Sequence, residues 1–165
     1  MPNRPPQPPI TVEMNDLVLP AYTNRYNALF GGKLMEMIDK AAAMCAIRYC
    51  HEHVVTASVE AIDFHTPIKA NFLVHICAKT IYVGRSSMMI KVIVWSENPN
   101  NGERTHCCTS FVTMVAIDTK GKPQPVPPLR VTTPQEQQDW KTAEHIRQAA
   151  LDRRSREKQY ENSSR

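Results

Sequence analysis

The sequence has no long apolar run, and nothing in its 165 residues approaches the roughly 18 residues of a membrane-spanning helix. The first nine residues are polar and proline-rich and contain no apolar core of a signal peptide. The five cysteines are an odd number and form no Cys-x-x-Cys pair, which argues against a disulfide framework and against a zinc site. We therefore expect a cytoplasmic chain with reduced thiols.

The motifs of several common enzyme classes are also missing. There is no Gly-x-Ser-x-Gly, no P-loop and no Gly-x-Gly-x-x-Gly, which disfavours a Ser-His-Asp hydrolase, a nucleoside triphosphatase and a Rossmann dehydrogenase. The six histidines include no His-Glu-x-x-His and no other convincing metal spacing. We expect no metal and no cofactor.

Positive charge is present, but it is confined to one end of the chain. The formal net charge is +4, yet residues 1–118 contain ten Lys or Arg against ten Asp or Glu, so the excess lies in residues 119–165. Carboxylates are interspersed with the basic residues there, which favours a mixed surface helix over a nucleic-acid site. A nucleic-acid partner is therefore not expected.

The apolar pattern predicts one α+β domain with a short extension. Only one stretch of the neutral part, residues 31–49, is rich in helix formers without internal Pro, and five other stretches alternate as strands do. A capping box at Thr133–Glu136 begins a second helix. We predict an antiparallel sheet covered by one long helix. The chain is expected to divide into a disordered arm at 1–9, a domain at 10–130 and a basic helical tail at 131–165. The strands are expected at 10–19, 54–64, 72–83, 87–95 and 104–118, and the tail helix at 133–158.

Asp39 is the first candidate for chemistry. On a helical wheel it lies outside the polar arc, next to three alanines, which leaves space beside a partly desolvated carboxylate. Such a group suits a general base or a nucleophile. The alternative is a carboxylate that is solvated, or ion-paired with a residue such as Arg25.

Gly31 and Gly32 lie where the first helix begins. Unsatisfied N–H groups and the helix dipole favour a developing oxyanion there, and glycine lets a carbonyl approach closely, although the pair could also be a simple turn. Seven residues separate Gly32 from Asp39, about 10 Å along a helix, which is long for one chain acting on one atom. A second subunit could supply the carboxylate.

A third candidate is the turn formed by Gly84, Arg85, Ser86 and Ser87. One cation and two hydroxyls suit a phosphate group, although an ordinary hairpin turn is an equally good interpretation. Because the first 118 residues are formally neutral, affinity for phosphates has to come from local groups such as Arg85 or Lys69.

Several segments, in order along the chain, resemble one known family. The most specific is the pattern Asn-x(5)-Phe-Gly-Gly-x(6)-Asp over residues 24–39, and shorter matches follow at 55–64, 67–69, 85–88, 94–98, 111–118 and 126–129. Together they resemble the hotdog-fold acyl-CoA thioesterases of the bacterial YciA and mammalian brain acyl-CoA hydrolase group. The resemblance covers about residues 10–130.

The resemblance implies a fold, an assembly and a site. The fold is a hotdog, in which a curved antiparallel sheet wraps a long helix, two chains join their sheets, and three dimers commonly form a hexamer. Carried over by position, Asp39 and Asn24 match catalytic residues that different protomers contribute to one site. Phe30, Gly31 and Gly32 match the segment that presents backbone N–H groups, and Arg85, Ser86 and Ser87 match a loop near coenzyme A.

The chain departs from related sequences at two turns. Asn27 stands where glycine is common, and Ala70-Asn71 replaces a Gly-Asp turn. Asparagine tolerates the left-handed conformation better than most residues, so both turns can be retained.

We therefore expect an acyl-CoA thioesterase that releases free fatty acid and CoA. Asp39 acts as general base or as nucleophile, Asn24 positions water or the carbonyl, and the Gly32 region polarises the thioester. One alternative is a non-catalytic hotdog module that binds acyl-CoA or regulates. Another is a hotdog dehydratase or isomerase, but such enzymes usually have a histidine near the site, and none follows Phe30-Gly-Gly here.

Overall fold

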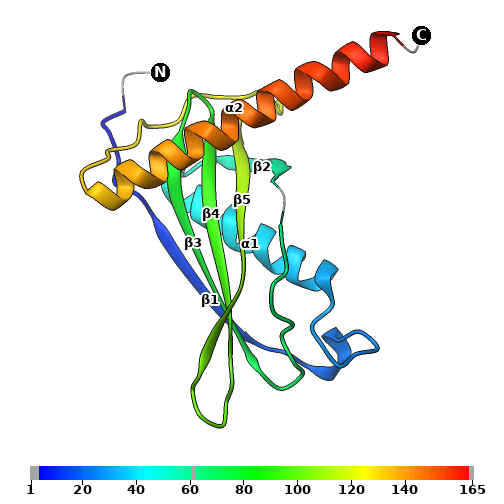
Figure 1. Ribbon diagram of the computed structural model, residues 1–165. Helices are drawn as coiled ribbons and strands as arrows, with labels where there is room; N and C mark the ends of the chain where they lie inside the picture. The colour runs from blue at the N-terminus through cyan, green and yellow to red at the C-terminus, as the bar shows by residue number, and fades with distance from the viewer. Residues whose placement is uncertain (1–3, 61, 164–165) are drawn as a thin grey trace. The chain divides into compact units, whose positions relative to one another are not determined.

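The computed structural model describes residues 4–60 and 62–163 (Figure 1). The chain divides into two compact units, residues 1–130 and residues 131–165. None of the helices in the described ranges is long and apolar enough to cross a membrane. The two units are described in turn.

The first unit is built on one antiparallel five-stranded sheet in the order β1-β3-β4-β5-β2. Every strand pair is antiparallel, and β1 and β2 lie at the two edges. The sheet curls around α1 (Figure 1). The strands are β1 (Thr11–Leu17), β2 (His53–Val59), β3 (Leu73–Val83), β4 (Ser87–Glu97) and β5 (Arg104–Ile117).

The central helix α1 (Gly31–Cys50) packs against one face of this sheet. Its buried side is a continuous stripe of small and aliphatic residues, which fits the closely curved sheet. The Cys45 thiol bonds the Ile10 carbonyl at 3.3 Å and the Thr80 hydroxyl at 3.4 Å, so it joins α1 to β3. The helix ends where His51 adopts a left-handed conformation at φ 56° and donates its N–H to the Ile47 carbonyl.

The strands bury their alternate residues against α1. Val74, Ile76 and Ala78 on β3 face the same side and are at most 1% exposed. Burial of a side chain the size of Val74 or Ile76 contributes about 1.5–3 kcal/mol. The predicted α+β architecture, with one helix covering an antiparallel sheet, is confirmed.

In the first unit, the predicted element boundaries are close to those observed, with one clear exception. The strand expected over residues 54–64 ends at Val59. A register shift between Thr56 and Ser58 marks a bulge. Among the described residues beyond Val59, isolated bonds such as Glu60 N–H to the Phe111 carbonyl continue toward β5. The alternating sequence predicted continued pairing because it contains no signal for the bulge.

The proline-rich arm was expected to be disordered, and residues 4–9 are an exception to that expectation. Arg4 donates a hydrogen bond to the Cys50 carbonyl at 3.0 Å and forms an ion pair with Glu52. Gln7 bonds the Pro128 carbonyl at 2.9 Å and accepts from the Arg130 N–H at 2.7 Å. A proline-rich segment makes no hydrogen bonds within itself, but its backbone can still form hydrogen bonds with another extended segment. Residues 1–3 lie outside the described residues.

The second unit consists of helix α2 (Pro134–Ser163). The predicted capping box is confirmed, since Glu136 N–H donates to the Thr133 hydroxyl at 3.2 Å and Thr133 N–H donates to the Glu136 carboxylate at 3.0 Å. The helix continues beyond the predicted end at residue 158. Near its basic end, Arg153 lies 3.9 Å from Glu157.

Candidate active site

The N-terminus of α1 presents two backbone donors. Phe30 is the N-cap residue, and its carbonyl accepts the N–H groups of Lys33 at 2.9 Å and Leu34 at 3.0 Å. In the described part of the chain, no hydrogen bond is found for the N–H groups of Gly31 and Gly32. These two donors, at the positive end of the helix dipole, can stabilise an oxyanion.

One phenylalanine ring lies near each of these two glycines. A Cβ atom added to Gly32 would lie only 2.7 Å from Cε1 of Phe30, so a side chain there requires the Phe30 ring to shift. A Cβ atom added to Gly31 would lie 4.0 Å from Cε2 of Phe64. Phe30 and Phe64 are both more than half exposed. Leaving a phenyl ring in water is less favourable than burying it.

Asp39 is held by a residue that was not predicted. The hydroxyl of Thr56 on β2 donates a hydrogen bond of 2.6 Å to Asp39 Oδ1, so the carboxylate points to the open edge of the sheet. Asp39 is exposed in the single chain, and the expected partial desolvation is therefore not reached within one protomer. The alternative partner, Arg25, instead contacts the ring of Tyr26. Thr56 lacked a sequence signal because the bulge beside it sets where its hydroxyl points.

Asn24 lies in a tight loop next to the α1 N-terminus. Its side-chain oxygen accepts hydrogen bonds from the N–H groups of Tyr26 at 2.9 Å and Ala28 at 3.3 Å, and Phe30 N–H bonds the Tyr22 carbonyl at 2.8 Å. The loop therefore uses the amide oxygen and leaves the amide NH₂ group to act as donor.

The two turns that departed from related sequences keep their conformation. Asn27 has φ 58° and Asn71 has φ 65°, both left-handed. Asparagine therefore occupies positions for which glycine is the more usual choice.

The residues predicted to contact CoA are not brought together within one chain. Lys69 pairs with Ala28, at the α1 N-terminal end of the sheet. Arg85, Ser86 and Ser87 lie at the opposite end, where the Ser86 carbonyl accepts the Ala116 N–H at 2.9 Å. The length of β3 separates these ends by about 33 Å.

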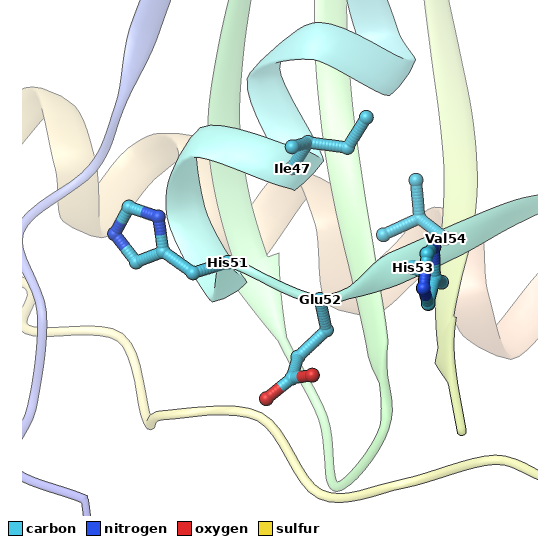
Figure 2. A pocket seen from close by; sticks show the side chains of 5 residues that line it. All are labelled: Ile47, His51, Glu52, His53 and Val54. Carbon is cyan, nitrogen blue, oxygen red and sulfur yellow. The ribbon is translucent and has the colours of Figure 1, made fainter. Parts of the chain in front are cut away.

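A pocket opens at the C-terminal end of α1. It has a volume of about 520 Å³ and is lined by Ile47, His51, Glu52, His53 and Val54 (Figure 2). Glu52 is held by Arg4 and by Gln124, whose side chain donates to it at 3.0 Å. None of the predicted site residues lines this pocket.

Cysteine and histidine side chains can hold a metal ion, and a cysteine thiolate can act as a nucleophile. In the described ranges, no three His, Cys, Asp or Glu side chains gather closely enough to hold a metal ion. Burial raises the pKa of the Cys108 thiol to about 11 and raises the pKa of Cys45 and Cys50, which keeps these thiols protonated.

Comparison with known proteins identifies the family. The model of the Thioesterase superfamily matches residues 26–103. YkhA of Bacillus subtilis, described as an uncharacterized acyl-CoA thioester hydrolase, is 44% identical over 119 residues, which cover 72% of this chain and 69% of that protein. The chain belongs to the hotdog-fold acyl-CoA thioesterases. The predicted family and enzyme class, thioester hydrolase, are confirmed.

Solved acyl-CoA thioesterases have the same fold. A hexameric acyl-CoA thioesterase superposes with TM-score 0.83 at 36% identity, covering 87% of this chain and 92% of that chain. The acyl-CoA hydrolase of Staphylococcus aureus, solved with butyryl coenzyme A and coenzyme A, superposes with TM-score 0.83 at 34% identity, covering 90% of this chain and 91% of that one. The predicted hotdog fold is confirmed.

Variants of the Staphylococcus aureus enzyme bear on this site and on α2. They carry alanine in place of one aspartate, one asparagine or one threonine. The asparagine precedes the aspartate by 15 residues and the threonine follows it by 17, the spacings of Asn24, Asp39 and Thr56 here. One variant covers 95% of this chain at TM-score 0.88, which residues 1–130 alone cannot supply, so that enzyme also has a counterpart of α2.

Proposed function

We propose that this thioesterase hydrolyses fatty acyl-CoA to a free fatty acid and CoA at a site built around Asp39, Asn24 and the N-terminus of α1. The observation that carries the proposal is the hydrogen bond of 2.6 Å from Thr56 to Asp39, because it fixes a carboxylate at the sheet edge. The matching spacings of the asparagine, aspartate and threonine in the Staphylococcus aureus enzyme support the same set.

In the general-base route, Asp39 accepts a proton from water and the resulting hydroxide attacks the thioester carbonyl carbon. The N–H groups of Gly31 and Gly32 stabilise the negative charge on the carbonyl oxygen. The carbon–sulfur bond then breaks, and the sulfur of CoA takes the proton from Asp39. In the nucleophilic route, Asp39 attacks the carbonyl carbon itself, CoA leaves as the thiolate, and water hydrolyses the acyl anhydride.

Asn24 contributes a donor in either route. Because the loop N–H groups of Tyr26 and Ala28 occupy its amide oxygen, the free NH₂ group can bond the carbonyl oxygen or the attacking water. This assigns the asparagine a donor role, whereas the sequence left open what it positions.

Two protomers complete each site in this proposal. Asp39 and Gly32 lie about 10 Å apart along α1, and Asp39 is exposed at the edge strand β2. Val55 and Val59 of β2 are 44% and 38% exposed, and Met35 of α1 is 46% exposed. Exposed apolar side chains at an unpaired edge strand are unfavourable. Pairing β2 with β2 of a second chain covers them, and the hexameric relative supports three such dimers.

The two-protomer site also explains how one CoA could contact residues at opposite ends of the sheet. Lys69 lies near the α1 N-terminus and Arg85 lies about one strand length away, so a single CoA contacts both only if different protomers supply them. Arg85 is exposed in the turn, with the Ser86 and Ser87 hydroxyls beside it. A guanidinium with adjacent hydroxyls suits the phosphates of CoA.

The test is release of free CoA thiol from a series of substrates running from acetyl-CoA to stearoyl-CoA. We expect steady turnover by the wild type and a fall in kcat of roughly 10²–10⁴-fold for Asp39→Asn. Tyr160→Ala, on α2, serves as a control that keeps wild-type rates. Stoichiometric binding of acyl-CoA without thiol release would instead identify a non-catalytic binding module.

A further inference from the structure

We propose that Phe64, together with Phe30, forms an apolar collar that encloses the reacting thioester at the α1 N-terminus. This inference rests on the proposed function and names a substrate-contacting residue outside the sequence-predicted set. The two rings lie near the two glycines whose N–H groups have no hydrogen-bond partner among the described residues, Phe30 near Gly32 and Phe64 near Gly31.

The position of Phe64 is fixed by its backbone neighbours. His65, the residue after Phe64, donates its N–H to the Cys107 carbonyl of β5 at 2.9 Å. Leu29 N–H bonds the Ile68 carbonyl at 2.7 Å, which connects the same segment to the residue before Phe30. The segment that follows β2 therefore bonds to both β5 and the entry to α1 (Figure 1).

The two rings remain open to solvent in the single chain. Phe30 is 59% exposed and Phe64 is 51% exposed, although both belong to well-bonded segments. Apolar rings held at the surface beside two free donors are explained if a ligand covers them. The pantetheine and acyl carbons on either side of a thioester carbonyl provide such a surface.

The collar has a specific chemical consequence. Hydrogen bonds from backbone N–H groups to an oxyanion strengthen when water is excluded and the local dielectric constant falls. The rings contact the atoms adjoining the carbonyl, which every acyl-CoA shares, and not the distal chain. Removing a ring should therefore slow the chemical step by the same factor for short and long substrates.

The experiment compares Phe64→Ala and Phe64→Tyr with the wild type, using acetyl-, octanoyl- and palmitoyl-CoA. We expect Phe64→Ala to lower kcat about tenfold for all three substrates with a smaller change in KM, and Phe64→Tyr to restore most of the rate because it keeps the ring. Tyr160→Ala, which removes a ring that is 78% exposed on α2, is the matched control.

Oligomeric state and thermal unfolding of each variant are measured alongside. An unchanged kcat, a loss that grows with acyl chain length, or dissociation of the oligomer by Phe64→Ala would each overturn the collar. Failure of the wild type to release thiol would overturn the proposed function itself, so the two failures are distinguishable.

Discussion

The hydroxyl of Thr56 donates a hydrogen bond of 2.6 Å to Oδ1 of Asp39, although 17 residues separate them in sequence. The bond joins α1 to the edge strand β2 beside the bulge between Thr56 and Ser58. It fixes one carboxylate oxygen and leaves the other to accept a proton or attack a carbonyl. Thr56 is thus a positioning residue for Asp39.

Removing this hydroxyl should lower activity without unfolding the chain. We expect Thr56→Val, which keeps the shape, to lower kcat roughly ten- to a hundredfold, the range of a hydrogen bond to a charged group. Thr56→Ser keeps the hydroxyl and should restore most of the rate. A fall in kcat with an unchanged KM and an unchanged unfolding temperature distinguishes positioning of the carboxylate from packing. Equal kcat values in Thr56→Val and Thr56→Ser would contradict this role.

The role of Asn24 is testable with a variant that keeps the loop. Aspartate can still accept the N–H groups of Tyr26 and Ala28, which now bond Asn24 at 2.9 and 3.3 Å, but it has no NH₂ donor. We expect Asn24→Asp to unfold at the same temperature as the wild type and to lose activity roughly a hundredfold. Near-normal turnover by Asn24→Asp would exclude the donor role.

The two glycines should respond differently to alanine. A Cβ at Gly32 would lie 2.7 Å from the Phe30 ring, so the ring must move, whereas a Cβ at Gly31 would lie 4.0 Å from Phe64, an ordinary contact. We expect Gly32→Ala to lower kcat/KM about tenfold more than Gly31→Ala. Similar losses in the two variants would mean that displacement of Phe30 has no effect on the site.

High pH should destabilise the fold through its buried thiols. Burial raises the pKa of Cys108 from 9.0 to about 11, so the unfolded chain releases this proton at lower pH than the folded chain does. The folded state then binds more protons than the unfolded state, and the free energy of unfolding falls as pH rises from 9.0 to about 11. Thermal unfolding across this window measures the slope, which Cys108→Ala should reduce. An unchanged slope in Cys108→Ala would mean that groups other than Cys108 cause the loss of stability at high pH.

Much of the fold followed from the sequence because its signals are local. Residues 31–49 are rich in helix formers, and the observed helix, Gly31–Cys50, ends one residue later. The capping box of α2 needs only Thr133 and Glu136. The pairing of Gln7 with Leu129 and the early end of β2 were not predicted, because that pairing and the bulge near Thr56 depend on distant segments.

The site was only partly accessible to the same reasoning. Asp39, Asn24 and the Phe30–Gly32 segment follow from spacing and resemblance, and their roles stay predictions. Thr56 and Phe64 could not be found, because one depends on a bulge and the other on bonds from residues 65 and 68 to β5 and to Leu29. The cytoplasmic location also stays a prediction.

The central claim is that Asn24 of one protomer and Asp39 of another form one thioesterase site. The most direct measurement is thiol release from palmitoyl-CoA by chains of Asp39→Asn and Asn24→Ala, assayed separately and after co-assembly in equal amounts. Each variant alone should be nearly inactive. In random mixed dimers one intact site forms in each hybrid, so activity should recover to about a quarter of the wild-type rate. No recovery in demonstrated hybrid dimers would contradict the shared site.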